Sequence, residues 1–207
     1  AVSALEKKLT WSDETALITG AGPDSIAEAV TAQLLAGGAR VIVTTSRLSS
    51  ARIARFKGLY RTHAARGAEL HVVPFDQGNF SDVENLCSWL LSSQFETRGA
   101  NRVQLKGPWL PTICFPFGAV PAEGDPTSLD ADIAATLQVN LIGVEKLVGS
   151  LANEVSQRGA DAPKVHIVLP LSPNHGQMGR DGLYAESKIG LETLLLRWEA
   201  EYDRWGQ

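Results

Sequence analysis

Two side chains near the end of the sequence, Tyr184 and Lys188, have the chemical types that proton transfer requires. Their segment predicts a helix, and residues four apart share one helical face, so the phenol and the ammonium meet on the same side. An isolated phenol keeps its proton up to about pH 10, and a neighbouring positive charge in a partly dehydrated cleft stabilises the phenolate. Such a phenol can protonate a carbonyl oxygen that becomes an alkoxide as hydride arrives from a reduced nicotinamide.

Ser172 lies in the polar, glycine-rich loop that precedes this helix. Its hydroxyl can hydrogen-bond the same carbonyl oxygen and fix its position. A tyrosine and a lysine at this spacing also form ordinary surface pairs, so the alternative is a solvated helix face without chemistry. The surrounding secondary structure determines whether these side chains form a proton-transfer site or a solvated surface pair.

The composition predicts one soluble domain. The chain has 207 residues, of which 44% are hydrophobic, and a net charge of −4, which suits a single sizeable core. No cluster of Lys and Arg is interleaved with aromatic residues, so we expect no nucleic-acid partner. No apolar run approaches the ~20 residues that span a bilayer and no signal peptide is evident. We therefore expect no membrane association and a cytoplasmic location.

Cysteine and histidine usage gives no sign of a disulfide framework or a metal site. Cys87 and Cys114 can form at most one bridge, and nothing suggests an oxidising compartment. The four histidines are scattered without ligand spacing: His63, His71, His166 and His175.

Short apolar runs alternate with helix-period segments along most of the chain. The expected strands are Thr15–Thr19, Arg40–Thr45, Glu69–Pro74, Thr112–Phe117 and Lys164–Pro170. The expected helices are Ile26–Ala36, Ala51–Arg66, Asp82–Leu91, Asp130–Glu154 and Leu183–Arg204. This alternation implies βαβ units with right-handed crossovers, and the near-continuous Val, Ile and Leu of the strands fits burial on both faces. We predict an α/β fold with a Rossmann-like, doubly wound parallel sheet.

Three segments stand outside this rhythm. Residues 1–14 are polar and charged and are expected to be a leader or linker, so that the domain occupies residues 15–207. Residues 92–111 are longer than an ordinary connection and predict an insertion that packs on the sheet edge or contacts a neighbour. Residues 120–127 follow the fourth strand and should lie at the carboxyl edge of the sheet, where such folds bind ligands.

A glycine turn directly after the first strand predicts a nucleotide site. In TGAGPDSIA, Gly20 and Gly22 allow a tight turn and a close approach of backbone to a pyrophosphate, which then sits at the N-terminus of the next helix. Ser25 can cap that helix and also donate to phosphate, and Ile26 follows it. The later glycines of a plain dinucleotide fingerprint are replaced here, and the spacing is one residue longer.

The second strand ends in Thr45, Ser46 and Arg47, without the acidic residue that would bind the free ribose hydroxyls of NAD. An arginine at this position matches a 2′-phosphate, so the expected cofactor is NADPH. The alternative is that Arg47 only begins a solvated helix turn. After the third strand, Asp76 and Gln77 can reach the adenine, although Asp76 can equally be a turn former.

With these residues in place, the sequence resembles the short-chain dehydrogenase/reductase family, and within it the ketoreductase domain of type I fatty acid synthases of the fungal and mycobacterial kind. The stretches that carry the resemblance are TGAGPDSIA, VIVTTSR, VVPFDQGNFSDVE, FPFGAVPAEGD and VLPLSPNHGQMGRDGLYAESKIGLETLLLRW. They cover nearly all of Thr15 to Trp198. The resemblance implies NADPH-dependent reduction of a 3-oxoacyl group, held as a phosphopantetheine thioester on an acyl carrier protein, within a multifunctional synthase.

The resemblance also implies roles for single residues. Tyr184 would be the proton donor, Lys188 would hold the nicotinamide ribose and favour the phenolate, and Ser172 would orient the substrate carbonyl. Asn140 matches the asparagine that supports a water-linked proton relay behind the lysine, although a polar residue facing solvent is the alternative. Gly118 stands where many relatives have an Asn-Ala-Gly motif, which is Phe-Gly-Ala here.

The family fold continues beyond its tyrosine helix with two more strands and a substrate-covering segment, so the resemblance implies a domain truncated after the fifth strand and its following helix. A structural or carrier-docking module without catalysis is the main alternative, motivated by the insertion and the missing sheet edge. A reductase of free small carbonyls or polyketides is a further one. For His175 there are two interpretations, a contact with the phosphopantetheine arm and a solvated loop histidine, and we prefer the second.

Overall fold

The computed structural model describes residues 10–159 and 163–205, and a five-stranded parallel sheet forms its centre. The strands are β1 (Thr15–Thr19), β2 (Arg40–Thr45), β3 (Glu69–Pro74), β6 (Ile113–Pro116) and β7 (His166–Ile167). They pair in the order β3-β2-β1-β6-β7, with every neighbouring pair parallel. The chain crosses from β3 back past β1 to β6, which creates a topological switch point between β1 and β6.

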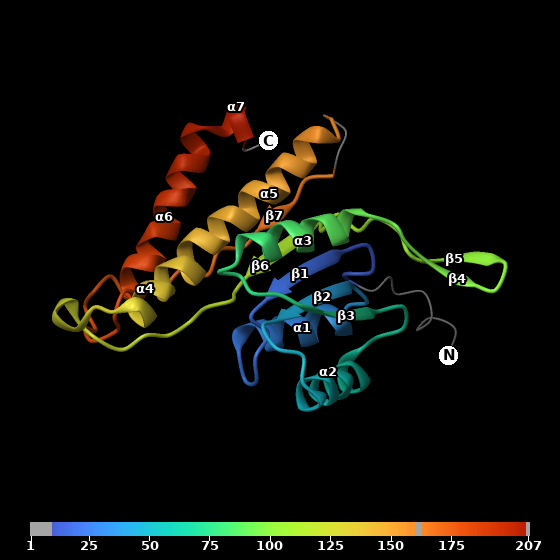
Figure 1. Ribbon diagram of the computed structural model, residues 1–207, viewed down its shortest axis with the longest axis horizontal. Coiled ribbons are helices and arrows are strands. Elements are labelled where there is room, and N and C mark those ends of the chain that lie inside the picture. The colour runs from blue at the N-terminus through green and yellow to red at the C-terminus, as the bar shows by residue number, and fades with distance from the viewer. Residues whose placement is uncertain (1–9, 160–162, 206–207) are drawn as a thin grey trace.

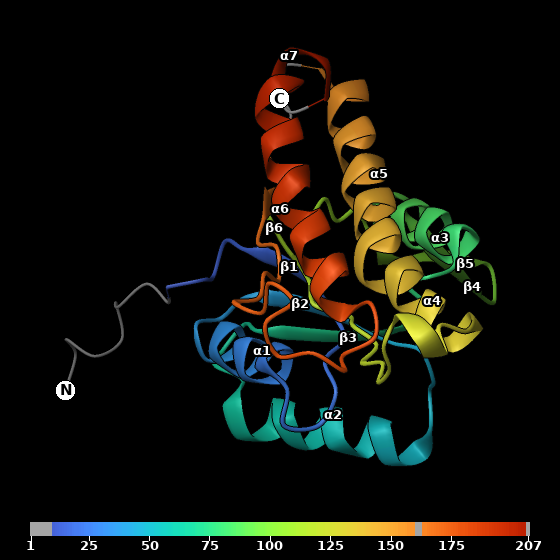
Figure 2. The same cartoon turned by 90° about the vertical axis from the view of Figure 1, so that its left-hand side faces the viewer.

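Helices cover both faces of the sheet, as Figures 1 and 2 show. One face carries α1 (Ile26–Ala36) and α2 (Ser50–His63), and the other carries α3 (Phe80–Leu91) and α5 (Gly143–Gln157). The helix α6 (Tyr184–Ala200) packs beside α5, and the short α7 (Tyr202–Trp205) follows it. The predicted doubly wound α/β fold is therefore confirmed.

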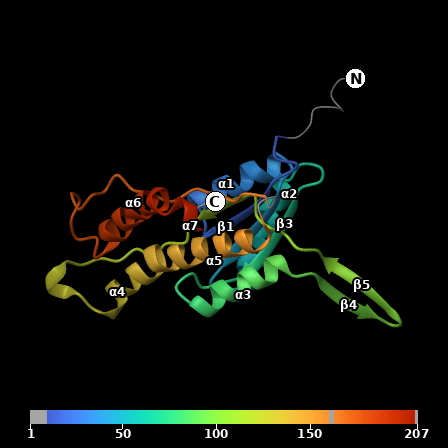
Figure 3. The ribbon, with the colours of Figure 1, turned by 90° about the horizontal axis from the view of Figure 1, so that it is seen from above.

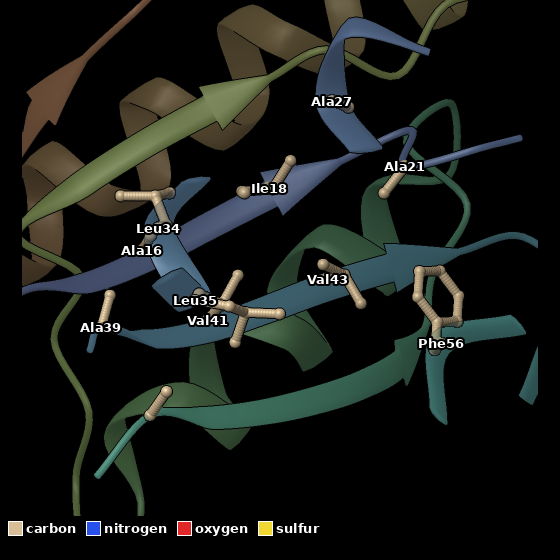
Figure 4. Close-up of a cluster of buried hydrophobic side chains, with 11 residues drawn as sticks. Ala16, Ile18, Ala21, Ala27, Leu34, Leu35, Ala39, Val41, Val43 and Phe56 are labelled. Atoms are coloured by element: carbon tan, nitrogen blue, oxygen red, sulfur yellow. The ribbon is translucent and has the colours of Figure 1, made fainter. Parts of the chain in front are cut away.

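The strands β1, β2, β3 and β6 supply alternate side chains to two hydrophobic cores. Ile18 of β1 and Val41 of β2 pack with Leu35 of α1 in the cluster drawn in Figure 4. Leu17 faces the opposite side, where it packs in a second cluster with Leu147 of α5. Because each such buried side chain contributes about 1.5–3 kcal/mol relative to exposure, burial on both faces fixes the register of the central strands.

The helix predicted from Asp130 to Glu154 is interrupted. The structure divides it into α4 (Ala131–Leu137), a π-turn η2 (Gln138–Ile142) and α5, and a single 3₁₀ turn, η1 (Pro126–Ser128), precedes α4. A π-turn contains one extra residue per turn and often marks a functional position in a helix. Here it turns Asn140 inward, with none of its surface exposed.

The insertion at residues 92–111 forms a β-hairpin of β4 (Gln94–Arg98) and β5 (Asn101–Lys106). It makes its own two-stranded antiparallel sheet and projects away from the body of the domain, as Figure 3 shows. Its base is fixed by the ammonium of Lys106, whose nitrogen lies 2.7–3.1 Å from four backbone carbonyl oxygens and shares its three N–H groups among them: those of Trp89, Leu90, Ser92 and Gly107. The hairpin therefore does not add a strand to the edge of the main sheet.

Residues 1–9 of the expected leader lie outside the described residues, but its last part contacts the domain. The backbone N–H of Trp11 donates to the carbonyl of Gly37, and the Trp11 ring lies where a side chain at position 37 would stand. Glu14 accepts a hydrogen bond from the hydroxyl of Thr112. Among the helices in the described part of the chain, none combines the length and apolar character needed to cross a bilayer.

Candidate active site

A cleft of about 220 Å³ opens at the carboxyl ends of β1, β2, β3 and β6. Seven of the residues expected to bind cofactor line it: Gly20, Gly22, Thr45, Ser46, Asp76, Gln77 and Gly118. They come from four separate segments of the chain and meet only because parallel strands end at the same edge. The cleft lies at the switch point of the sheet, where folds of this class bind their ligands.

The turn after β1 is shaped by a close approach of two backbones. Gly20 has φ +71°, and a Cβ on it would lie 2.5 Å from the Cα of Gly118. Gly22 donates its N–H to the carbonyl of Gly20 at 2.7 Å. The nearest atom to a Cβ built on Gly22 would be the Gly20 carbonyl oxygen, at 4.0 Å. The turn therefore brings bare backbone to the cleft, which is the feature that a pyrophosphate requires.

Ser25 and Ile26 stand at the beginning of α1, outside the lining of the cleft. The Ser25 hydroxyl accepts from the N–H of Glu28 at 3.1 Å and donates to the carbonyl of Gly22 at 2.7 Å. The predicted cap is thus present, but its single proton is used within the turn. Ile26 leaves 76% of its surface exposed.

Gln77 braces the floor of the cleft. Its amide oxygen accepts from the hydroxyl of Thr19 at 2.6 Å, and its amide nitrogen donates to the carbonyls of Gly118 and Val139 at 2.8 and 2.9 Å. The N–H of Gly118 donates to the same Thr19 hydroxyl at 2.8 Å. Because both N–H groups of Gln77 are used, its amide has no donor left for adenine, and its part in the site is to hold β1, β6 and η2 together.

Asp76 lies at the exposed rim and forms a turn of the kind expected as its alternative role. Its carboxylate accepts from the N–H of Gly78 at 3.0 Å, and its own N–H donates to Asp82 at 2.8 Å. It also lines the cleft.

The arginines near the end of β2 differ in their partners. Arg52 of α2 lines the cleft and donates to the hydroxyl of Thr45 at 2.5 Å and to the carbonyl of Arg47 at 3.3 Å. Arg55 is held by Glu28 through two bonds of 2.6 Å, and Arg55 lowers the pKa of that carboxyl. Arg47 itself is exposed in the turn before α2 and is not part of the cleft lining. Arg52 and Arg55 both line the cleft, and Arg52 is the one whose guanidinium is bonded to the end of β2.

Tyr184 and Lys188 occupy the first turns of α6 on one face, as their spacing predicts. The Lys188 ammonium lies 5.3 Å from the centroid of the Tyr184 ring, and Lys188 leaves only 2% of its surface exposed. Burial lowers the pKa of Lys188. The tyrosine is half-buried. A surface pair on a solvated helix face does not describe this arrangement, because the lysine is inside the domain.

A short chain of hydrogen bonds connects Ser172 to the start of α6. The N–H of Asn174 donates to the Ser172 hydroxyl at 3.1 Å, and the Asn174 side chain donates to Asp181 at 2.7 Å. The N–H of Tyr184 then donates to the carbonyl of Asp181 at 3.0 Å. Asn174 is 5% exposed, and no sequence pattern distinguishes it from the other polar residues of its loop.

Asn140 joins the wall of the cleft to the tyrosine helix. Its oxygen accepts from the N–H of Val120 at 2.8 Å, and its nitrogen donates to the carbonyl of Val120 at 3.1 Å and to the hydroxyl of Ser187 at 3.4 Å. Val120 lines the cleft. The solvent-facing alternative for Asn140 is therefore excluded, and Ser187 is a site residue that sequence reasoning missed.

The two loops above the site are paired with each other. Gly124, in the loop after β6, forms an isolated parallel bridge with Asp181, in the loop before α6. His175 of the second loop lies 2.9 Å from Glu192 of α6. The expected position of residues 120–127 beside the site is thus what the structure has, and His175 is a partly exposed loop residue with a carboxylate partner.

Comparisons with known proteins agree with this description. No family model matches the chain. Its fold is shared with levodione reductase (TM-score 0.68, 19% identity, 95% of this chain and 69% of that one). A putative 2-deoxy-d-gluconate 3-dehydrogenase from Agrobacterium tumefaciens, solved with bound NADP, is similar to the same degree (TM-score 0.67, 18% identity, 95% and 70%). The chain thus has the short-chain dehydrogenase/reductase fold.

The sequence itself aligns with one segment of much longer proteins. It is 40% identical to the fatty acid synthase subunit alpha of Schizosaccharomyces pombe over 96% of this chain, and 42% identical to the fatty acid synthase alpha subunit stcJ of Emericella nidulans over 97%. The chain spans 10% and 12% of the length of these two relatives. The predicted resemblance to a fungal fatty acid synthase segment with the short-chain dehydrogenase/reductase fold is confirmed.

Proposed function

We propose that this chain is the 3-oxoacyl-[acyl-carrier-protein] reductase domain of a multifunctional fatty acid synthase and uses NADPH. The observation that carries the proposal is the Tyr184–Lys188 pair on α6, in which the Lys188 ammonium is buried. Asn140 connects this helix to Val120 in the wall of the cleft. The partners of the reductase domain would be an acyl carrier protein domain and the other domains of the synthase. The relatives at about 40% identity, which are fungal synthase alpha subunits, support this context.

The residues of the cleft suit a dinucleotide. The positive φ of Gly20 and the open space at Gly22 leave room for a pyrophosphate against the backbone. Thr45, Ser46 and Arg52 provide hydroxyl and cationic groups at the end of β2, where the adenosine ribose lies in folds of this class. The absence of an acidic side chain at Thr45–Arg47, together with the fixed Arg52, favours a 2′-phosphate over a free 2′-hydroxyl. When bound, the reduced nicotinamide supplies hydride.

The remaining steps belong to the protein. The hydroxyl of Ser172, which accepts from Asn174, is assigned to hold the substrate carbonyl oxygen. The phenol of Tyr184 is assigned to protonate that oxygen as it becomes an alkoxide. Lys188 is assigned to favour the resulting phenolate and to bind the ribose. Each role depends on the others, because a proton donor contributes only when the carbonyl is held within hydrogen-bonding reach.

The test follows NADPH absorbance with a 3-oxoacyl thioester, or a decalone surrogate, on the complete subunit. Tyr184→Phe should lower kcat by at least 100-fold, in line with the 10² to 10⁴ that a positioned proton donor contributes. A rate within a few-fold of the wild type would show that Tyr184 is not the donor. Replacing Tyr202, a partly exposed tyrosine stacked edge-on against Trp198, with Phe is the matched control and should leave the rate unchanged.

A second experiment distinguishes catalysis from a purely structural or carrier-docking role. NADPH and NADH are titrated into the complete subunit, and binding is followed by the fluorescence of the reduced nicotinamide. Saturable binding with preference for NADPH supports the reductase. No saturable binding of either nucleotide to the complete subunit would favour the docking module instead. Comparing the reduction rates of free small ketones and of 3-oxoacyl thioesters tests the third alternative, a reductase of free small carbonyls or polyketides.

A further inference from the structure

We propose that Ser187 is a positioning residue, which aligns Tyr184 and Lys188 with the wall of the cofactor cleft. The proposal rests on the proposed function, since it concerns how that site is assembled. Ser187 itself touches no reacting group. It acts through the backbone of Tyr184 and through the side chain of Asn140.

The contacts of Ser187 connect two parts of the site. Its hydroxyl donates to the carbonyl of Tyr184 at 2.7 Å and accepts from the amide of Asn140 at 3.4 Å. Asn140 in turn holds both backbone polar groups of Val120. The Ser187 hydroxyl oxygen, through Asn140, therefore connects the first turn of α6 to the loop that lines the cleft.

The packing around Ser187 leaves this contact little freedom to adjust. Ser187 has none of its surface exposed. One turn further along α6, a Cβ on Gly190 would lie 2.6 Å from the side chain of Leu141, the neighbour of Asn140 in η2. Directly after η2, at the start of α5, a Cβ on Gly143 would lie 2.1 Å from the carbonyl oxygen of Gln77. The helix α6, the π-turn η2 and the floor of the cleft are thus in close contact, with Ser187 supplying the polar link between the first two.

Ser187 does more than a helix serine that bonds only its own helix. A serine that bonds a carbonyl three residues earlier is common in helices. Ser187, however, also receives the second N–H of a fully buried asparagine. Removing its oxygen leaves that N–H of Asn140 without its partner, while the other N–H keeps the carbonyl of Val120. It also removes the polar link between η2 and the turn of α6 that carries Tyr184.

The kinetic test uses Ser187→Ala in the complete subunit, with Thr193→Ala as the matched control. Thr193 lies on the exposed side of α6, where its hydroxyl bonds the carbonyl of Ile189 at 3.4 Å. Misalignment of the proton donor affects the transition state more than ground-state binding. We expect kcat of Ser187→Ala to fall about tenfold while the KM for NADPH stays within twofold, and Thr193→Ala to match the wild type. A kcat within twofold of the wild type, or an equal loss in both variants, would overturn the proposal.

A spectroscopic test needs no activity, so its outcome is separate from that of the proposed function. The chain contains three tyrosines, and ¹³Cζ-tyrosine labelling gives one resonance for each of Tyr60, Tyr184 and Tyr202. In Ser187→Ala we expect the Tyr184 resonance to move while the other two stay in place. If no resonance moves, or if all three move together, Ser187 does not position Tyr184. A wild-type subunit without reductase activity would instead refute the proposed function.

Discussion

The side chain of Asn140 satisfies both backbone hydrogen-bonding groups of Val120, at 2.8 and 3.1 Å, across 20 residues of sequence. This two-point contact fixes the loop after β6 against the π-turn η2. Because Val120 lines the cleft and Asn140 also meets Ser187 of α6, the cleft and the helix that carries Tyr184 and Lys188 share one anchor. The stability of that anchor and the binding of cofactor should therefore change together.

Replacing Asn140 tests this coupling. Asn140→Ala leaves the N–H and carbonyl of Val120 without their partner, and each unsatisfied, partly buried group costs about 1 kcal/mol or more. We expect the free energy of unfolding, measured with urea, to fall by about 2 kcal/mol and NADPH affinity to fall with it. The exposed Asn153 of α5 is the control, and its replacement by Ala should change stability by less than about 0.5 kcal/mol. Equal unfolding midpoints for the two variants would contradict the assigned anchor.

Gly118 should tolerate no side chain. A Cβ there would lie 2.9 Å from the amide oxygen of Gln77 and 3.1 Å from the hydroxyl of Thr19, so Gly118→Ala must displace the brace at the floor of the cleft. We expect at least a tenfold loss of NADPH affinity, measured by fluorescence titration. Gly149→Ala in α5 meets no atom within 4 Å and should raise stability by up to about 1 kcal/mol through helix propensity. A Gly118→Ala chain that binds NADPH normally would show that the cleft is not the cofactor site.

Selectivity for NADPH should depend on Arg52 more than on Arg47. The Arg52 guanidinium is already oriented by Thr45, whereas the exposed Arg47 side chain would have to be ordered on binding. Arg52→Ala should weaken NADPH binding about tenfold or more, because a charge-assisted hydrogen bond contributes about 1.5–3 kcal/mol, and should leave NADH binding within twofold. Arg47→Ala should cause a smaller loss of NADPH.

The exposed Arg61 on the same helix controls for a general loss of positive charge. If Arg61→Ala and Arg52→Ala weaken NADPH binding equally, the effect is long-range electrostatics and Arg52 has no specific role. The comparison should be made at fixed salt, since exposed charges are screened beyond about 10 Å at 0.1 M ionic strength.

The Arg40–Glu69 pair between β2 and β3 predicts a pH dependence of stability. Two hydrogen bonds from Arg40, at 2.8 and 3.0 Å, lower the pKa of Glu69 from 4.5 to about 2. A carboxyl whose pKa is lowered on folding stabilises the fold above its unfolded pKa, and this contribution is lost as the pH falls from about 4.5 to about 2. Because both side chains are about a third or more exposed, we expect less than about 1 kcal/mol.

Glu69→Gln should therefore be less stable than the wild type at pH 7, and the difference should shrink between pH 4.5 and 2. Urea unfolding at pH 7, 4 and 2.5 measures it. Glu199→Gln, at an exposed position of α6, is the control and should show no such convergence. A constant difference between wild type and Glu69→Gln at all three values would rule out the ion pair as its source.

The first three strands, the alternation of strands and helices and the Tyr184–Lys188 pair followed from the sequence alone, whereas the strand predicted at Lys164–Pro170 is reduced to β7 (His166–Ile167). They depend on local patterns: β1, β2 and β3 begin and end where their apolar runs do, and a helix places residues four apart on one face whatever surrounds it. The turn at Gly20 belongs to the same group, because only a glycine readily adopts its φ of +71°.

Only the tertiary structure decided how these parts are joined. Gln77 and Asn140 bond backbone groups that are distant in the sequence, and Ser187 receives the side chain of Asn140. Arg52 is set by its contact with the end of β2, and the hairpin at residues 94–106 by its base on Lys106. Thr19 and Gln77 are 58 residues apart, and Asn140 and Ser187 are 47 apart. Polar side chains can satisfy many neighbours equally well, so their partners are set by the packing of the sheet and helices, which no local pattern records.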